Sequence, residues 1–233
     1  MNRLLLTGCL AAWGVLTAGA QSETSASCCG EKAAAHCEKP SGQCCGKGGA
    51  CAEMANPVVN TIMNRRSVRK YQARPVEHEK LALLATCAIN APSAVNRQPW
   101  LVRVVEDAKL ISDVSDVYRK ANAEQVARDP DFRNMFRNAP NIICVCTPAK
   151  GGGELDAGLL GENVMLAAHS LGLGTCCLGG PVRFLKESPE AKFFMDRLNI
   201  PADYQLCYII AVGYPDEQPE ARPRDASKIE FIK

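Results

Sequence analysis

From residue 57 to the end of the chain, hydrophobic and polar positions alternate with two different periods. Apolar residues that recur every three or four positions predict helices within 57–63, 81–88, 110–118, 155–171 and 189–198. Short apolar runs predict strands at 101–105, 141–146, 175–178 and 205–212. Helices packed around a single sheet of this kind form an α+β or α/β domain.

Local signals support two of these helix boundaries. Asn56 and Pro57 are typical of an N-cap and a first helical residue. A different helix, the long apolar one predicted within 155–171, is expected to end at Gly172 and Gly174.

The first 20 residues have the layout of a secretory signal peptide. Arg3 precedes an apolar stretch over 4–16, and Ala18 and Ala20 lie just before a possible cut ahead of Gln21. Two alternatives stay open: a lipoprotein box ending at Cys9, or an uncleaved anchor at the short end of the spanning length. No later segment is apolar enough to span a membrane, so we expect an exported, periplasmic protein.

Residues 21–56 cannot form a packed core, because they are rich in Ser, Ala, Gly, Lys and Glu. Of the chain's 13 cysteines, six lie here: Cys28, Cys29, Cys37, Cys44, Cys45 and Cys51. They are open to disulfide pairing, to disorder, or to binding Cu(I) or Zn(II) together with His36. Their spacing fits no zinc motif, which favours disulfides or disorder and predicts no metal. A metal-binding or thiol-redox module, with the folded domain 57–233 as its carrier, is the alternative function class.

The charge balance excludes one large class of partners. The chain has 27 basic and 25 acidic residues, a net charge of +2, and no long run of one sign. A nucleic-acid-binding surface is therefore not expected. Because 47% of the residues are hydrophobic, the chain can bury a substantial core.

Two basic groups, far apart in sequence, are candidates for binding a phosphate. Arg65-Arg66-Ser67-Val68-Arg69 follows the first helix and offers three guanidinium groups and a hydroxyl, which suit a phosphate monoester. Near the end, Gly213-Tyr214-Pro215 leads to Arg222-Pro223-Arg224. The alternative for the first group is that its arginines only complement the dipole of the preceding helix.

Two further segments offer contacts for a flat, polar ligand. The loop 91–100 contains Pro92, Ser93, Asn96 and Gln98, whose side chains include the neutral donors and acceptors that a heterocycle or sugar chain requires. Residues 174–180 present bare backbone that a ring can approach closely. The alternative for the loop is an ordinary connection in which Trp100 fills a core position.

In their order along the chain these four segments resemble the nitroreductase family of FMN-dependent oxidoreductases. The motifs are Arg-Arg-Ser-x-Arg, Pro-Ser-x-x-Asn-x-Gln-Pro-Trp, Gly-Leu-Gly-Thr-Cys-x-Leu-Gly-Gly and Gly-Tyr-Pro before the final basic pair. The resemblance covers about the whole of 57–233. It implies a nitroreductase-like α+β fold, with a mainly antiparallel sheet packed by helices, in an intertwined homodimer with two FMN molecules at its interface.

The resemblance also assigns cofactor-binding residues. Those implied for the phosphate and ribityl oxygens are Arg65, Ser67 and Arg69, with Arg66 adjacent, and those implied to close on the phosphate are Arg222 and Arg224. The residues implied to come from the partner are Pro92, Ser93 and Asn96. Those implied to lie against the ring are Leu178, Gly179 and Gly180. Some relatives have an acidic residue at the position of Gly179, so here only its backbone amide could contact flavin N5.

The resemblance implies that flavin N5 is the reactive atom and that no side-chain nucleophile is needed. Hydride would pass from NAD(P)H, or another donor outside the cytoplasm, to nitroaromatic or quinone acceptors in ping-pong fashion, with a halotyrosine dehalogenase-like activity as a rarer alternative. Residues 118–137 are expected to cover the pocket. Their arginines, Arg128, Arg133 and Arg137, indicate either an anionic substrate or a solvated helix face.

Two smaller expectations also follow. The tail 229–232 would add a strand to the partner's sheet, although it is short. The neighbouring Cys176 and Cys177 lie close to the expected ring, where a redox role competes with that of small structural residues.

Overall fold

The computed structural model describes residues 56–233, and these residues form a four-stranded antiparallel sheet. The strands are β1 (Leu101–Val105), β2 (Asn141–Pro148), β3 (Gly174–Leu178) and β4 (Tyr204–Gly213), in the order β1-β2-β4-β3. All four predicted strands are confirmed. The predicted leader, its Cys9 alternative and the six cysteines between 28 and 51 lie outside the described residues. Within the part that is described, no helix is long and apolar enough to cross a membrane.

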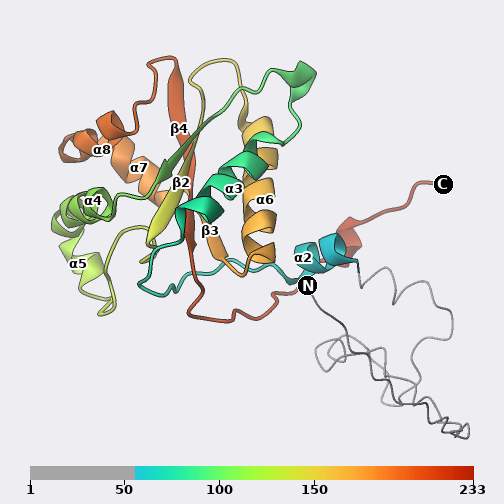
Figure 1. The fold of residues 1–233 in the computed structure, drawn as a ribbon, viewed down its shortest axis with the longest axis horizontal. Helices are drawn as coiled ribbons and strands as arrows, with labels where there is room; N and C mark the ends of the chain where they lie inside the picture. The colour runs from blue at the N-terminus through green and yellow to red at the C-terminus, as the bar shows by residue number, and fades with distance from the viewer. Residues whose placement is uncertain (1–55) are drawn as a thin grey trace, which may run out of the picture. The chain divides into compact units, whose positions relative to one another are not determined.

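Helices cover both faces of the sheet (Figure 1). One face is packed by α3 (His78–Ile89) and α6 (Glu154–Ser170), and the other by α4 (Ala108–Ala121), α7 (Gly180–Glu187) and α8 (Lys192–Arg197). The remaining helical elements are α2 (Pro57–Asn64), α5 (Ala123–Val126), η2 (Ala94–Asn96), η3 (Pro189–Ala191) and η4 (Ala226–Lys228). The α+β architecture expected from the sequence is therefore confirmed.

Strand β2 explains why the apolar run at its centre is continuous rather than alternating. Successive side chains of a strand point to opposite faces. Cys144 and Cys146 enter the core beneath α4, α7 and α8, while Ile143 and Val145 enter the core beneath α3 and α6. The two cysteines behave as small apolar residues, and burial raises the pKa of the Cys146 thiol to about 11.

The helix signals in the sequence were correct at both ends that they marked. The Asn56 side chain caps α2 by accepting from the N–H groups of Val58 and Val59, at 2.9 and 3.3 Å. Helix α6 ends just before Gly172, which has a φ of +73°. Helix α7 was not predicted, because Gly179 and Gly180 indicate accessible backbone and are poor helix formers.

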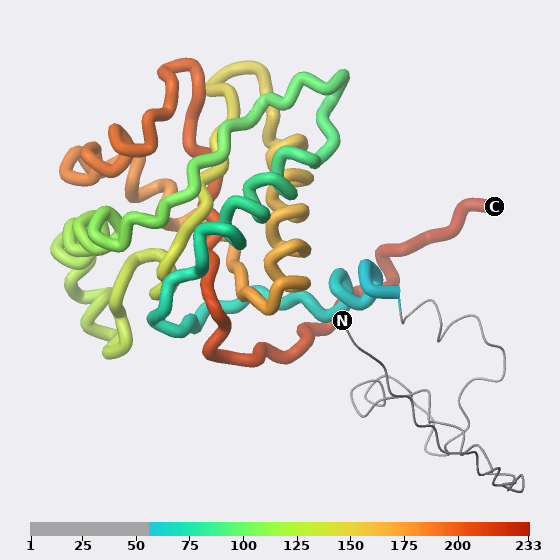
Figure 2. The backbone as a smooth tube through the Cα atoms, in the orientation of Figure 1, coloured from blue at the N-terminus to red at the C-terminus, as the bar shows by residue number. Residues whose placement is uncertain are grey.

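Two segments that are far apart in sequence lie side by side beyond the end of the sheet. Residues 65–73 follow α2, and residues 214–217 follow β4; Figure 2 traces both segments. Ser67 forms a parallel bridge to Thr175, and Tyr71 forms an antiparallel bridge to Pro215. This arrangement brings the first basic group of the sequence to edge strand β3.

Candidate active site

A cavity of about 1190 Å³ lies beside the end of β3. Its walls come from residues 69–73, from the junction of β3 and α7 at 176–181, from the turn-rich segment 125–138, and from Asp216 and Glu217. This volume is sufficient for a cofactor or a drug-sized ligand. The residues predicted to bind the cofactor that line it are Arg69, Leu178, Gly179 and Gly180.

Gly174 allows the first basic segment to reach β3. The N–H of Val68 donates to the carbonyl of Thr175 at 2.9 Å. A Cβ atom on Gly174 would lie only 2.8 Å from the Cβ of Val68, which is far closer than carbon atoms tolerate. Any side chain at position 174 would therefore push this segment away from the strand.

Glu217 fixes the backbone at Arg69. Its Oε1 accepts from the N–H of Arg69 and from the N–H of Lys70, the latter at 3.1 Å. The Arg69 guanidinium donates to the carbonyl of Ser67 at 3.1 Å and has no carboxylate partner within the described part of the chain. An unpaired cation is thus held on the cavity wall, where it could bind an anion or a carbonyl oxygen.

Gly179 and Gly180 leave open space on the same cavity. A Cβ atom added to either glycine would meet no heavy atom within 4 Å. Gly179 has a φ of −94°, so its backbone does not itself require glycine. The missing side chains instead leave the main chain accessible to a flat ring.

Arg65 and Arg66 have different roles at the end of α2. Arg66 Nη1 donates to the carbonyl of Met63 at 2.7 Å, as expected for a basic residue that satisfies a helix C-terminus. The Nε of Arg65 lies 3.3 Å from Glu162 Oε1 on α6, but this buried donor has no hydrogen-bond partner. His169 lies on α6, the helix that carries Glu162. Burial lowers the pKa of the His169 imidazole, and the nearby charges of Arg65 and Arg66 lower it further.

The loop with Pro92, Ser93 and Asn96 lies elsewhere in this chain. It is close to the N-terminal end of α6, since the Ala94 N–H donates to Asp156 at 3.4 Å. In Figure 1 this loop and α2 lie at opposite ends of α6. The described chain therefore does not bring the loop to the cavity.

Arg222 and Arg224 are exposed on the C-terminal segment and do not line the cavity. The hydrogen bonds of Arg224 are local, such as the one from its Nη1 to the carbonyl of Arg222 at 3.3 Å. Their convergence with Arg65 and Ser67 on one phosphate stays a prediction. The tail at 229–232 is exposed and forms no strand in the described chain.

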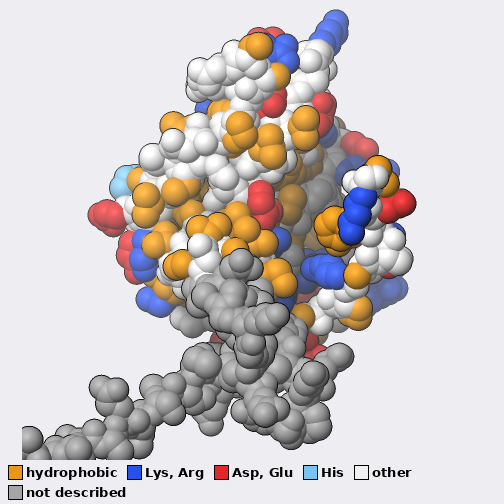
Figure 3. Space-filling view, turned by 90° about the vertical axis from the view of Figure 1, so that its right-hand side faces the viewer, with side chains coloured by type: hydrophobic (Ala, Val, Ile, Leu, Met, Phe, Trp, Pro, Cys, Tyr) orange, Lys and Arg blue, Asp and Glu red, His pale blue; other side chains and the backbone are white. Residues whose placement is uncertain are grey.

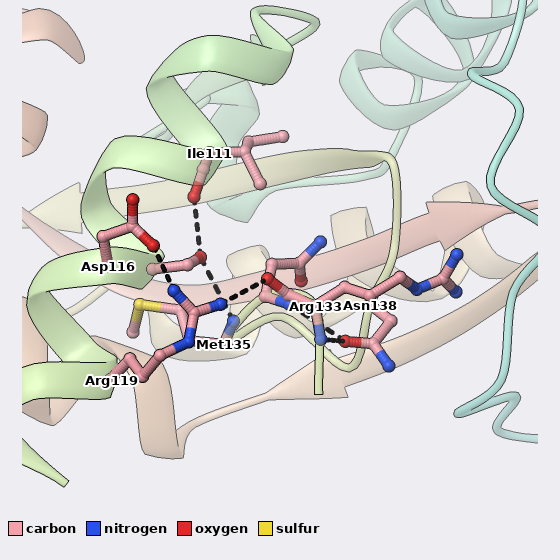
Figure 4. A network of polar contacts seen from close by, with 8 residues as sticks. Ile111, Asp116, Arg119, Arg133, Met135 and Asn138 are labelled. Atoms are coloured by element: carbon pink, nitrogen blue, oxygen red, sulfur yellow. Dashed lines mark hydrogen bonds and ion pairs between the residues drawn. The ribbon is translucent and has the colours of Figure 1, made fainter. Parts of the chain in front are cut away.

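The expectation that residues 118–137 cover the pocket is confirmed, because much of this stretch lines the cavity. A network of hydrogen bonds holds the part of the wall at 131–138 (Figure 4). Asn138 Oδ1 accepts from the N–H groups of Arg133 and Asn134, at 2.7 and 2.9 Å. Arg119 on α4 pairs with Asp116 and donates to the carbonyl of Arg133. The turn within this wall, as distinct from its place over the pocket, was signalled only by its asparagines, which are typical of turns.

Cys176 and Cys177 point to opposite sides of β3, because successive residues in a strand do so. Cys176 is buried at the cavity, whereas Cys177 is exposed. Burial raises the pKa of both thiols, so neither has the character of a reactive thiolate. In the described part of the chain, no cluster of three or more side chains could hold a metal ion.

The model of the Nitroreductase family matches residues 62–214, and the chain belongs to that family. A protein of Methanothermobacter thermautotrophicus, named provisionally as an NADH dehydrogenase or NAD(P)H nitroreductase, is 31% identical over 171 residues, which cover 71% of this chain and 81% of that protein.

Two solved structures share the fold. An FMN-dependent nitroreductase of Clostridium difficile is 28% identical with a TM-score of 0.61, and the match covers 76% of this chain and 100% of that one. A nitroreductase with bound FMN from Desulfitobacterium hafniense is 26% identical with a TM-score of 0.67, covering 76% and 99%.

Proposed function

We propose that this chain is an FMN-dependent NAD(P)H oxidoreductase that reduces nitroaromatic, quinone or similar acceptors by a ping-pong mechanism. The observation that carries the proposal is a single cavity that combines the unpaired Arg69 guanidinium with the bare backbone of Gly179 and Gly180. The solved Desulfitobacterium hafniense nitroreductase, which contains FMN, supports the choice of cofactor.

The residues present fit FMN. Arg69 has no carboxylate partner among the described residues and can bind an anionic or carbonyl group, whereas Arg65, whose buried Nε has no hydrogen-bond partner, would have to exchange its ion pair with Glu162 to do so. Gly179 and Gly180 leave space for a ring, and the Gly179 N–H is the group expected to reach flavin N5. When bound, FMN supplies the hydride chemistry, while the protein positions it and limits the access of water.

We also propose a homodimer, because one face of the described chain exposes many apolar side chains. Figure 3 shows hydrophobic side chains gathered on the side where α2 and α6 lie. On α2 and α6 the exposed apolar residues are Val58, Val59, Ile62, Met63, Leu155 and Leu159. Exposed apolar patches mark association sites. A second copy on this face would supply the loop with Ser93 and Asn96 that one chain keeps away from its own cavity.

The test is to purify the full chain and examine its colour. We expect yellow protein whose absorbance bleaches with NADH or NADPH and returns when a nitroaromatic or quinone is added. Double-reciprocal plots at several donor concentrations should be parallel, as a ping-pong mechanism requires. Stopped-flow reduction with a panel of donors identifies the preferred one, and halotyrosines tested as acceptors address the dehalogenase alternative. Colourless protein that does not take up added FMN would refute the proposal.

The proposed location is the periplasm, and it rests on the signal-peptide pattern of residues 1–20 alone. Sequencing the N-terminus of the mature protein tests it. A start at Gln21 supports cleavage of the leader and export. A lipid on Cys9 would mean export as an anchored lipoprotein instead, and an intact Met1 would refute cleavage.

A further inference from the structure

The three arginines that the sequence placed over the pocket have different environments. Arg133 Nη2 donates to the carbonyl of Tyr71 at 2.8 Å, so this guanidinium ties two parts of the cavity wall together. Arg128 does not line the cavity. Arg137 lines it, is exposed, and makes no side-chain hydrogen bond or ion pair to any described residue. Only Arg137 of the three is available to a ligand in the cavity.

The backbone fixes the position of Arg137. Arg137 and Asn138 have φ values of +60° and +64°, a left-handed conformation that asparagine tolerates but that arginine rarely adopts. The Asn138 side chain maintains it, because it accepts from the N–H of Arg133 and donates to the carbonyl of Asp131 at 2.8 Å. Conformations of this kind persist where surrounding contacts determine them, and they are frequent at ligand sites.

Arg137 has no carboxylate ion-pair partner among the described residues, which leaves its guanidinium free for an anion. Although burial raises the pKa of the Cys176 thiol overall, the charges of Arg69 and Arg137 both act to lower it, so both guanidinium groups lie near this residue. Glu217 is the carboxylate that opposes them, and it already accepts two backbone N–H groups. Three further acidic residues line the cavity, Asp129, Asp131 and Asp216, and none of them forms an ion pair with Arg137 in the described chain.

An aromatic surface lines the same cavity. Tyr118 and Phe132 both contribute to its wall, and their rings stack with centroids 6.1 Å apart. We propose that Arg137 is a specificity-determining residue that binds the carboxylate of an aromatic acid, so that acidic aromatic acceptors are preferred over their neutral analogues. This inference rests on the proposed function. Of the residues expected at the FMN phosphate and ribityl chain, Arg65 and Ser67 do not line this cavity and Arg69 does, so the proposed carboxylate subsite at Arg137 shares the cavity with part of the expected flavin site.

The test compares wild type, Arg137→Gln and Arg128→Gln in the full chain loaded with FMN. Arg128→Gln is the matched control, because it removes the same charge from the same segment but away from the cavity. The acceptors are para-nitrobenzoate and the neutral para-nitrobenzamide. In Arg137→Gln we expect the KM for para-nitrobenzoate to rise about 10-fold, while the KM for para-nitrobenzamide changes by less than about 2-fold. Arg137→Lys should recover part of the difference.

A second readout does not depend on turnover. Benzoate binding, measured by calorimetry with benzamide as the neutral comparison, should weaken about 10-fold in Arg137→Gln and stay unchanged in Arg128→Gln. Equal effects on both acceptors, an equal effect of Arg128→Gln, or a loss of bound FMN in Arg137→Gln would overturn the proposal. Protein that takes up no FMN refutes the proposed function instead, and benzoate binding then still decides whether Arg137 forms an anion subsite.

Discussion

Replacing Gly174 with alanine tests whether the segment with Ser67 and Arg69 needs a glycine partner on β3. The new Cβ would lie 2.8 Å from the Cβ of Val68 and 2.9 Å from both of its γ carbons. Ordinary contacts between carbon atoms are about 3.5–4.0 Å, so Val68 would have to move by about 0.7–1.2 Å.

The magnitude of the effect follows from what can move. Rotation of the Val68 side chain cannot relieve the contact, because the closest atom is its Cβ. The backbone must shift instead, which strains the 2.9 Å hydrogen bond between the Val68 N–H and the Thr175 carbonyl. Overpacking of this kind lowers the free energy of unfolding by about 1–3 kcal/mol. In a domain of this size, the melting temperature should fall by about 2–12 °C.

Thermal unfolding of the FMN-free protein, followed by circular dichroism, measures this change. Gly179→Ala is the matched control, because a Cβ there has no heavy atom within 4 Å. We expect its stability to stay within about 0.5 kcal/mol of wild type. FMN affinity, measured by flavin fluorescence, should also fall in Gly174→Ala because Ser67 and Arg69 are displaced. If Gly174→Ala melts at the same temperature as Gly179→Ala, the argument from close approach is wrong.

Three other substitutions test separate parts of the fold. In Gly161→Ala the new Cβ would lie 3.0 Å from Cζ of Tyr208 and would disturb the hydrogen bond from the Tyr208 hydroxyl to the Ala157 carbonyl on α6. The free energy of unfolding, measured in urea, should fall by about 1–2 kcal/mol. Adding Tyr208→Phe should recover part of this loss. Hydrogen bonds, of which the one from Tyr214 is the largest, lower the pKa of Glu77 to about 2. The contribution of Glu77 to stability is therefore complete above its unfolded pKa of about 4.5 and is lost as the pH falls toward 2. Glu77→Gln should flatten the dependence of the free energy of unfolding on pH in that window, and an unchanged slope would contradict the assignment. Val95 has a φ of +48° and a side chain that is 91% exposed, so the valine is strained there without packing against the described chain. Because asparagine tolerates this conformation, Val95→Asn should raise the free energy of unfolding by about 1 kcal/mol. A decrease would mean that the valine side chain is covered in solution.

Elements whose burial repeats along the sequence could be predicted. Helix α3 buries Leu81, Leu84 and Ala88, the same three residues that carry its helical spacing. Strand β1 was predicted with its observed bounds. These patterns are visible because the apolar residues of each element repeat with one local period, that of a helix or of a strand. The packing of the two cores on the sheet then decides only which face of each element is buried.

The place of residues 118–137 over the cavity was predicted, but the contacts that hold this wall could not be predicted from a period, because they are irregular. Asn138 holds the turn through hydrogen bonds to backbone groups four to seven residues away, and such bonds leave no periodic trace. Helix α7 is a different case, since Pro181 at its start is a recognised signal. The two glycines before Pro181 serve both the cavity and the start of the helix, and bare glycine backbone by itself predicts only the first of these roles.

Glu217 shows most clearly what limits inference from one sequence. Motifs identified Arg69 because its residue type suits an anion, but the carboxylate that fixes the Arg69 backbone is 148 positions away and belongs to no motif. A chemical group that binds a ligand can be recognised by type, whereas a group that orients it is recognised only by contact. The same reasoning applies to Arg65, which was predicted as a ligand-binding residue while its partner Glu162 on α6 was not. If Glu162 competes with the phosphate for Arg65, Glu162→Gln should bind FMN more tightly than wild type, and a weaker affinity would instead mean that Glu162 orients the guanidinium for the cofactor.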